Sequence, residues 1–255
     1  MRYSQAPVRR AEILRELSAE GHVSVNRLSG RWAVSEMTIR RDLHELAGQG
    51  LLRLVRGGAR PHRPQDRGLP FPHRTRSNLA AKRAIAVYAA GHLHPEATIA
   101  LDSGTTVVEL ARSIPANLPL TVITHSLAAM AILAGRPEIR LIGLGGVYNE
   151  RTRSFGGPDT RRALRGLRAD VLFLAASAVN RDGIACATPW DADTKRALLD
   201  VAVRVVVPAD ATKFRAAAPV AICGLDRVDV LITDADVTSD PRPGFPVVQR
   251  AVVQR

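Results

Sequence analysis

Three loops rich in Gly, Ser and Thr each follow an apolar run in the C-terminal two thirds of this 255-residue chain. They span residues 102–106 (DSGTT), 124–126 (THS) and 143–146 (GLGG). Glycine permits close approach of a ligand to the backbone, hydroxyls donate hydrogen bonds, and a helix beginning at Thr105 attracts an anion. One such loop is weak evidence, because Gly and Ser are ordinary turn residues. The three together predict a cradle for a phosphate or a polyol.

Other kinds of site are not indicated. The sequence contains no Walker loop, and no GxGxxG follows an expected strand, so nucleotides are not the predicted ligand. His92 and His94 have no third ligand at a suitable spacing, so we interpret them as loop residues. Cys186 and Cys223 lie far apart among apolar residues, which favours two buried, reduced thiols. We therefore predict neither a metal nor a cofactor.

A second set of polar side chains shares one face of an expected helix that begins at the N-cap Ser35 and ends near Ala47. Its apolar positions recur with helical spacing and point inward. The opposite face displays Ser35, Glu36, Thr38, Arg40, Arg41 and His44. Arginine can bond guanine O6 and N7, and hydroxyls can contact base edges, so this face suits a DNA groove. The alternative is an ordinary three-helix bundle with a solvated polar face.

The surrounding pattern fits a winged helix-turn-helix. We expect helices at about 7–20 and 26–32, a short extended stretch between them, and a strand at 51–56. Gly57 and Gly58 would form the tip of a β-hairpin. The basic residues of that hairpin could lie along a phosphate backbone, and they are Arg53, Arg56 and Arg60.

Charge is concentrated at the same end of the chain. The net charge is +12, and residues 1–76 hold 15 arginines, no lysine and seven acidic residues, giving +8 and leaving +4 for the rest. A basic excess at one end indicates nucleic acid as a partner. The alternative is that arginine is simply abundant, since the chain has 33 arginines and three lysines.

The chain divides into a DNA-binding domain at 1–59, a proline-rich linker at 60–77 and an effector-binding domain at 78–255. In the last of these, short runs apolar on both faces alternate with helical patterns, which predicts a mostly parallel, doubly wound α/β sheet. The expected strands are 98–101, 120–124, 139–144, 171–175, 203–207 and 228–233. The expected helices are 79–91, 105–113, 126–134, 158–166 and 191–202.

The uncharged run at 113–135 is long enough to resemble a membrane helix. It contains prolines and polar residues, however, so a strand, a turn and a buried helix explain it better. No basic-then-apolar signal segment opens the chain. We expect a soluble, cytoplasmic protein.

Residues 9–59 resemble the helix-turn-helix of the DeoR family of bacterial transcription regulators, most specifically in VSEMTIRRDLHEL at 34–46 and GGA at 57–59. The resemblance implies that the helix from Ser35 is the recognition helix and that Thr38, Arg40 and Arg41 contact the DNA. An alternative role for either arginine is to contact phosphates only, with Asp42 orienting one of them rather than touching DNA. The DNA-binding residues proposed on both grounds are Ser35, Glu36, Thr38, Arg40, Arg41, Arg53, Arg56, Gly57 and Gly58.

Residues 78–235 resemble the effector domain of the same family, which is related in fold to ribose-5-phosphate isomerase. The matching strings are LDSGTTVVELA at 101–111, THS at 124–126, GGVYNERTRSFGGP at 145–158 and DTKRALLDVAVRVVVPADATKF at 193–214. The resemblance implies a phosphorylated sugar or sugar derivative as ligand. The effector-binding residues are then Asp102, Ser103, Gly104, Thr105, Thr106, Thr124, Ser126, Gly145, Gly146, Lys195 and Lys213.

The chain departs from the family pattern at several positions. His125 stands where asparagine is more usual, Ala175 and Ala178 replace typical glycines, and Asp191 and Asp193 stand where Glu is more common. These departures bear on the identity of the ligand and not on the fold.

We predict a sequence-specific transcriptional regulator, with a repressor favoured, that binds operator DNA as a homodimer or homotetramer and is not an enzyme. One alternative is a sugar-phosphate isomerase or deaminase. The loop at 175–180 offers no acid, but Asp102 and Asp193 remain as candidate bases. A non-specific architectural DNA binder is a further alternative, although it would leave the second domain unused.

Overall fold

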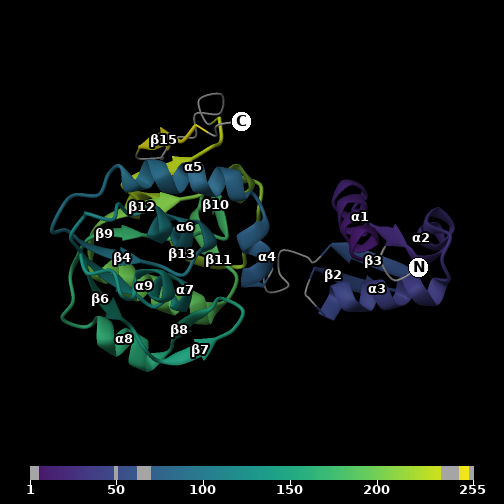
Figure 1. Cartoon of the computed structure of the whole chain (residues 1–255), viewed down its shortest axis with the longest axis horizontal. Coiled ribbons are helices and arrows are strands. Elements are labelled where there is room, and N and C mark those ends of the chain that lie inside the picture. Colours follow the sequence, from purple (N-terminus) through teal and green to yellow (C-terminus); the bar gives the residue numbers. More distant parts are fainter. Residues whose placement is uncertain (1–5, 49–50, 62–69, 237–246, 253–255) are drawn as a thin grey trace. The chain divides into compact units, whose positions relative to one another are not determined.

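The computed structural model describes residues 6–48, 51–61, 70–236 and 247–252. The chain forms two compact units, Met1–Pro70 and Phe71–Arg255 (Figure 1). The elements of the N-terminal unit are α1 (Ala6–Glu20), β1 (Val23–Ser24), α2 (Val25–Trp32), α3 (Glu36–Gly48), β2 (Leu52–Val55) and β3 (Gly58–Pro61). The strands form one antiparallel sheet in the order β1-β3-β2. The predicted winged helix-turn-helix is confirmed.

Local capping explains the turn between α2 and α3. Ser24 accepts a hydrogen bond from the amide of Arg27 (3.2 Å) and so caps α2. Ala33 ends that helix in the left-handed conformation, with φ of 48°. Ser35 then caps α3, because its Oγ accepts from the amide of Thr38 (3.2 Å). The turn itself therefore consists of the left-handed Ala33, which ends α2, and the Ser35 cap, which begins α3.

Asp42 holds α1 against α3. It is 2% exposed, and its two carboxylate oxygens accept from Nε of Arg9 (2.6 Å) and Nε of Arg10 (2.8 Å). The expectation that Asp42 orients Arg40 or Arg41 is wrong, because Asp42 lies on the buried face of α3 while those two arginines are exposed. Ile39 and Leu43 share this buried face.

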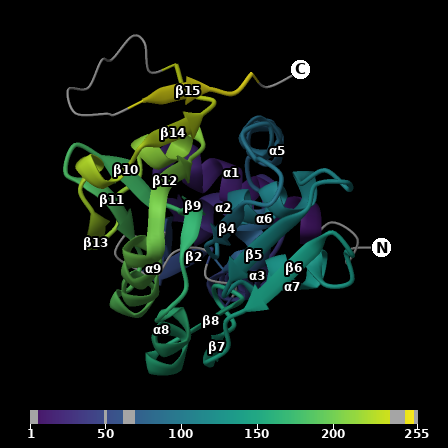
Figure 2. The same ribbon diagram turned by 90° about the vertical axis from the view of Figure 1, so that its left-hand side faces the viewer.

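The C-terminal unit is built on a seven-stranded sheet in which every neighbouring pair is parallel, in the order β15-β14-β12-β9-β4-β5-β6 (Figure 2). Its strands are β4 (Thr98–Leu101), β5 (Leu120–Thr124), β6 (Ile139–Gly143), β9 (Ala169–Phe173), β12 (Ala202–Pro208), β14 (Val230–Thr233) and β15 (Val248–Arg250). Its main helices are α5 (Leu79–Ala90), α6 (Thr105–Ser113), α7 (Leu127–Leu133), α8 (Pro158–Leu164) and α9 (Pro189–Val201).

Two apolar cores lie on the two faces of this sheet. Leu101 of β4 packs in the core that includes α5, α6 and α7, while the preceding Ala100 packs in the core that includes α8 and α9. Phe173 and Leu172 of β9 divide between the cores in the same way. Because successive side chains point to opposite faces, strands buried on both sides must be apolar throughout. The predicted doubly wound α/β class is confirmed.

Several short elements were not predicted. They are α4 (Phe71–Arg76), β7 (Val147–Asn149), β8 (Ser154–Gly156), β10 (Ala178–Asn180), β11 (Gly183–Cys186), β13 (Val220–Cys223), the edge strand β15 and two 3₁₀ turns, η2 (Ala211–Phe214) and η3 (Leu225–Arg227). The segment expected as a linker thus carries the end of β3 and all of α4, and residues 62–69 between them lie outside the described ranges. Prolines allow this, since Pro72 occupies the first turn of α4, where its missing N–H costs nothing. Among the described helices, none is long and apolar enough to cross a membrane.

Substituting Asp42 should selectively destabilise the N-terminal unit. Asp42→Ala leaves the 4%-exposed Arg9 buried without its partner, which costs about 3–5 kcal/mol. Trp32 lies in this unit and Trp190 in the other, so fluorescence-detected urea unfolding of the full chain in a Trp190→Phe background isolates the transition. The control is Glu45→Ala, because Glu45 is 51% exposed and 4.0 Å from Arg10, and it should cost about 1 kcal/mol or less. Equal losses for the two variants would contradict this assignment.

Candidate functional site

The strand order of the large sheet reverses between β4 and β9. From β4 the chain proceeds outward through β5 and β6, and from β9 it proceeds the other way through β12 and β14. Loops at the carboxyl ends of the two strands flanking such a reversal diverge to opposite faces and leave a crevice. The loops that follow β4 and β9 begin at Asp102 and Leu174. The first predicted loop therefore lies at the usual ligand position of an open α/β sheet.

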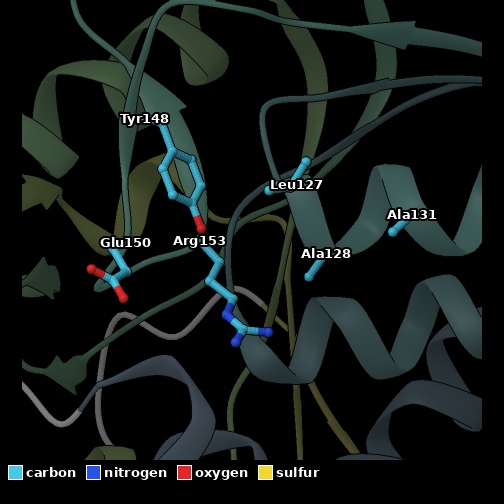
Figure 3. A pocket seen from close by; sticks show the side chains of 6 residues that line it. All are labelled: Leu127, Ala128, Ala131, Tyr148, Glu150 and Arg153. Carbon is cyan, nitrogen blue, oxygen red and sulfur yellow. The ribbon is translucent and has the colours of Figure 1, made fainter.

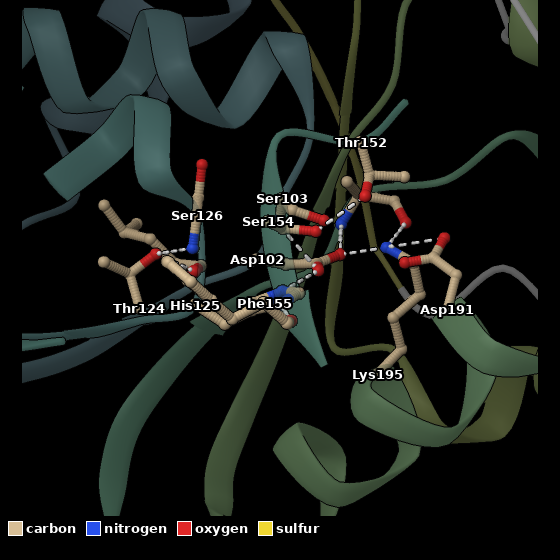
Figure 4. A network of polar contacts seen from close by, with 12 residues as sticks. Asp102, Ser103, Thr124, His125, Ser126, Thr152, Ser154, Phe155, Asp191 and Lys195 are labelled. Carbon is tan, nitrogen blue, oxygen red and sulfur yellow. Dashed lines mark hydrogen bonds and ion pairs between the residues drawn. The ribbon is translucent and has the colours of Figure 1, made fainter. Parts of the chain in front are cut away.

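Asp102 is the centre of a buried polar network at this end of the sheet (Figure 4). Its side chain is fully buried. Oδ1 accepts hydrogen bonds from the amide of Ser103 (2.7 Å) and from Nε2 of His125 (2.9 Å). Oδ2 accepts from the amide of Ala175 (2.8 Å) and from Nζ of Lys195 on α9. The carboxylate thus connects the loops after β4, β5 and β9 to α9.

The charges in this network are mutually dependent. Burial alone would raise the pKa of Asp102, but Lys195 and His125 outweigh burial and hold the pKa below its ordinary value. Burial would likewise lower the pKa of Lys195, and Asp102 and Asp191 raise it instead. Asp191 lies 3.8 Å from the same ammonium, and its pKa is raised by burial. Removing either member of the Asp102–Lys195 pair would leave a buried charge uncompensated.

His125 connects the network to the β7–β8 hairpin. Its Nδ1 lies 2.7 Å from the carbonyl oxygen of Phe155, and its Nε2 lies on Asp102. The two ring nitrogens therefore join the β7–β8 hairpin to the carboxylate of Asp102. The side chain is 1% exposed. The histidine that departs from the family pattern therefore has a specific role in positioning β8 beside Asp102.

A cluster of cations lies within electrostatic reach of this network. Lys82 on α5 is 3% exposed, and its Nζ donates to the carbonyl oxygens of Arg74 and, at 2.7 Å, Ser77. The pKa of Lys82 is lowered to about 8, mainly by burial, with Lys213 and Arg74 also lowering it and Asp210 opposing them. The pKa of Lys213 is lowered by burial and by Arg74. We call Arg74, Lys82 and Lys213 the cation cluster.

Three buried oxygen atoms near these groups lack a hydrogen-bond partner within the described part of the chain. They are Oγ of Ser103, Oγ1 of Thr194 and Oδ2 of Asp210, on residues that are 4%, 1% and 1% exposed. Buried polar groups are almost always paired in folded proteins. The backbone around Ser103 is also tightly packed, because a Cβ on Gly104 would lie 2.3 Å from the Cβ of Ala175. These atoms mark places where a bound ligand could complete the hydrogen bonding.

The other predicted hydroxyls are distributed between the site and the scaffold. Thr105 and Thr106 occupy the first turn of α6 and are 7% and 5% exposed. Thr124 instead donates to the carbonyl oxygen of Leu101 (2.7 Å) and accepts from the amide of Ser126. Ser126 in turn caps α7 by accepting from an amide one turn later. The structure therefore uses Thr124 and Ser126 to fix the second loop.

Gly145 and Gly146 have different surroundings. The carbonyl oxygen of Gly145 accepts from Oγ1 of Thr160 (2.6 Å), and a Cβ on Gly145 would meet no atom within 4 Å. Gly146 has φ of +133°, and a Cβ there would lie 2.2 Å from Thr160 Oγ1 and 2.7 Å from the carbonyl oxygen of Gly156. Gly146 is therefore required for the close approach of the β7–β8 hairpin to α8.

Sequence reasoning missed Arg74, Lys82 and Asp210 and treated His125 only as a departure. One signal for Lys82 was available: it is the third of only three lysines in an arginine-rich chain, and the other two were already assigned to the site. Arg74 lies in the segment that its prolines marked as a linker. Nothing in the sequence alone indicated that α4 belongs to the site.

A separate cleft of about 400 Å³ lies beside α7 and the β7–β8 hairpin (Figure 3). Its lining residues are Leu127, Ala128, Ala131, Tyr148, Glu150 and Arg153. Elsewhere, Cys186 and Cys223 are free thiols whose pKa burial raises to about 11. Within the described ranges, no group of three or more His, Cys, Asp or Glu residues could hold a metal ion.

In the N-terminal unit, α3 presents a charged outer face. Arg40 pairs with Glu36 one turn earlier (3.1 Å), and its carbonyl oxygen accepts from Nδ1 of His44 (2.8 Å). Arg41 is exposed, and its guanidinium makes no hydrogen bond or ion pair with another described residue. Ser35 and Thr38 share a hydrogen bond between their hydroxyls (2.9 Å) at the start of the helix.

The hairpin of β2 and β3 carries the remaining predicted basic residues. Arg53 and Arg60 are directly opposite each other in the antiparallel ladder, and like charges so placed repel. Arg56 and Gly57 form the exposed two-residue turn. Gly58 is buried in β3, since a Cβ there would lie 2.0 Å from the carbonyl oxygen of Val23. Arg56 and Arg60 are thus exposed on the wing, Arg53 is half-buried, and Gly58 serves the packing of β1.

Comparison with known proteins identifies the chain. Residues 77–235 match the family described as "DeoR C terminal sensor domain", and residues 9–65 match "DeoR-like helix-turn-helix domain". The chain belongs to the DeoR family of transcriptional regulators. The resemblance stated from the sequence is confirmed, and this DeoR-family chain is a DNA-binding regulator of transcription.

Relatives of the DeoR-family chain include both repressors and activators. The "Transcriptional repressor AccR" of Agrobacterium fabrum is 33% identical over 237 residues, covering 92% of this chain and 92% of that protein. The "L-fucose operon activator" of Haemophilus influenzae is 30% identical over 223 residues, covering 87% and 89%. Among solved structures, ribose 5-phosphate isomerase A of Methanocaldococcus jannaschii aligns with 54% of this chain and 55% of its own, at 19% identity and a TM-score of 0.41.

Two adjacent glycines of the DeoR-family chain should respond differently to substitution. Gly146→Ala places a Cβ against backbone and hydroxyl atoms at an unfavourable φ, and we expect a loss of about 1–3 kcal/mol in the free energy of unfolding. Gly145→Ala should change it by about 0.5 kcal/mol or less. Urea unfolding followed by Trp190 fluorescence in a Trp32→Phe background measures both. Equal losses in the free energy of unfolding for the two variants would contradict the role of Gly146 in the close approach of the hairpin to α8.

Proposed function

We propose that this DeoR-family chain is a transcriptional repressor whose operator affinity is controlled by a phosphorylated sugar or sugar derivative. The ligand would bind in the crevice between the loops that follow β4 and β9. The observation that carries this proposal is that the charge of Arg74 acts on Lys213 and on Asp102, whose loop also holds the buried, unpartnered hydroxyl of Ser103. Asp102, Asp191 and Asp210 offset part of the repulsion among these cations, and a bound anion would offset it further.

The phosphate end of the ligand fits the cation cluster. A phosphate monoester is close to dianionic at neutral pH and offers three strong acceptor oxygens. Arg74 and Lys213 would pair with it, and Ser103 would donate from its free Oγ. The first amides of α6 support an anion there, because the N-cap residue Gly104 supplies no side-chain cap.

The sugar end of the ligand fits the other side of Asp102. Asp191 lies beside Lys195, and Oγ1 of Thr194 on the same helix is buried without a partner. A carboxylate and a hydroxyl are suitable partners for the hydroxyl groups of a polyol. Lys195 and Asp102 would then serve mainly to hold this side of the crevice in place.

The same contacts favour binding without turnover. An isomerase needs a carboxylate or histidine free to accept a proton from carbon. Asp102 is fully engaged by four donors, and its charge is stabilised by Lys195. Asp193, the other candidate base, is 53% exposed and lies 3.7 Å from Arg196. We therefore propose that the chain is not an enzyme.

On the DNA side, α3 would enter the major groove with Arg40 and Arg41, and the arginines of the wing would contact phosphates. The repulsion between Arg53 and Arg60 would be relieved by phosphate oxygens. We also propose a homo-oligomer, since paired heads on two half-sites give useful specificity. Ligand binding can change operator affinity only if the ligand binds one assembly state more tightly than another.

The test uses the full-length protein and duplex from the promoter region beside its gene. Fluorescence anisotropy should show tighter binding to this duplex than to a random duplex at the same salt concentration. A thermal-shift panel of sugar phosphates and their unphosphorylated sugars should then give a phosphorylated hit that weakens the complex. Failure to prefer any promoter duplex would refute the regulator, and a hit that needs no phosphate would refute the proposed ligand class.

Arg74 should be required for the response to that hit. Arg74→Met removes one cation of the cluster, and we expect an affinity for the phosphorylated hit at least about tenfold lower, with operator affinity kept. Arg76→Met is the matched control, because Arg76 is exposed on the same short helix, and it should retain the response. Isothermal titration for the ligand and anisotropy for the operator measure the two effects. An Arg74→Met variant with wild-type ligand affinity would count against the phosphate position.

A further inference from the structure

The outer face of α3 is centred on a residue that sequence reasoning did not assign to DNA. Met37 and His44 are seven residues apart and therefore lie on one line along the helix. Arg40 and Arg41 are three and four residues after Met37, so they flank it on either side. On the exposed face of α3, which also carries Glu36 and His44, an apolar side chain thus lies between two arginines.

Met37 is exposed to an unusual degree for its position. Its exposure is 72%, whereas the apolar residues Ile39 and Leu43 of the same helix are 0% and 1% exposed. The N-terminal unit therefore does not use Met37 in its core. A large apolar side chain held in water at the start of a helix, among charged groups, gains free energy when a partner covers it.

The chemistry of the major groove offers one apolar group for this side chain. Thymine carries a C5 methyl there, and the other three bases present only hydrogen-bonding atoms and ring edges. The thioether of methionine is a weak acceptor and has no donor, so it cannot read amide or carbonyl groups well. Its flexible, polarizable chain can pack closely on a methyl group.

We propose that Met37 reads the methyl group of a thymine in each operator half-site, between bases or phosphates contacted by Arg40 and Arg41. This inference rests on the proposed placement of α3 in the major groove. Position favours Met37 for this role, because the N-terminal residues of a recognition helix reach the base edges and Met37 is the second residue of α3. Met37 is then a specificity-determining residue and contributes little to non-specific binding.

Replacing thymine by uracil tests this directly, because the change removes only the methyl group. The probe is the duplex that full-length protein enriches from a random-sequence pool, with each thymine replaced in turn by deoxyuridine. Burying one methyl group is worth about 0.8 kcal/mol, so wild type should lose about fourfold in affinity at one position in each half-site. Met37→Ala should bind the thymine and uracil duplexes equally.

A matched variant separates this effect from general loss of exposed apolar surface. Val8 is 64% exposed on α1, so Val8→Ala should keep the full preference for thymine. Thermal unfolding should be unchanged in both variants. If wild type is indifferent to every uracil substitution, or if Met37→Ala keeps the wild-type pattern, the inference is overturned while operator binding stands. If no duplex is enriched from the pool, sequence-specific binding fails and the inference fails with it.

Discussion

The C-terminal unit depends on burying one negative charge. Asp102 lies directly after β4, at the carboxyl end of an inner strand of the parallel sheet, and is out of contact with water; a carboxylate there is tolerated only when it is fully paired and hydrogen-bonded. The fold meets this requirement with the ammonium of Lys195, the ring of His125 and two backbone amides. These donors come from parts of the chain that are distant in sequence. Satisfying Asp102 therefore fixes the relative positions of the loops that form the crevice.

The short helix α4 extends the same electrostatic arrangement toward the start of the C-terminal unit. Phe71 anchors it, since the amide of Phe71 donates to the carbonyl oxygen of Arg151 (3.0 Å) and its ring lies 5.5 Å from the guanidinium of Arg74. The buried ammonium of Lys82 bonds the carbonyl oxygens at the other end of α4. The attractions of Asp102 and Asp191 for Arg74 are already present without a ligand. A phosphate that competes for Arg74 would act on the helix that directly follows the DNA-binding unit in sequence.

Much of this structure was predictable from the sequence, for identifiable reasons. Strands such as β4 and β5 are short, apolar on both faces and flanked by polar turns. This pattern predicts a parallel sheet covered on both sides. Ser24 and Ser35 are residues that favour the N-cap position, so they indicate where α2 and α3 begin. The predicted loop at 102–106 fell at the reversal of strand order, where a crevice forms.

What escaped prediction depends on contacts between distant residues. Asp42 was assigned to neighbouring arginines, whereas its partners are Arg9 and Arg10 on another helix. Arg74 was not predicted as a site residue, because the prolines around it are equally compatible with a linker and with the first turn of a helix. The three-residue strands of the β7–β8 hairpin are too short to show a period. His125 departs from the family pattern, but the sequence does not indicate its partners. Asp102 and the carbonyl oxygen of Phe155 lie 23 and 30 residues away along the chain.

The most direct test of this account is the response of the Asp102→Asn variant to the phosphorylated ligand found by thermal shift. The amide removes the negative charge that holds Lys195 and His125, while the N-terminal unit is untouched. Anisotropy with the promoter duplex should show wild-type operator affinity in the absence of ligand and no release when the ligand is added. The exposed Asp193→Asn control on α9 should release normally. Full ligand-dependent release by a folded Asp102→Asn protein would contradict the central role given to Asp102.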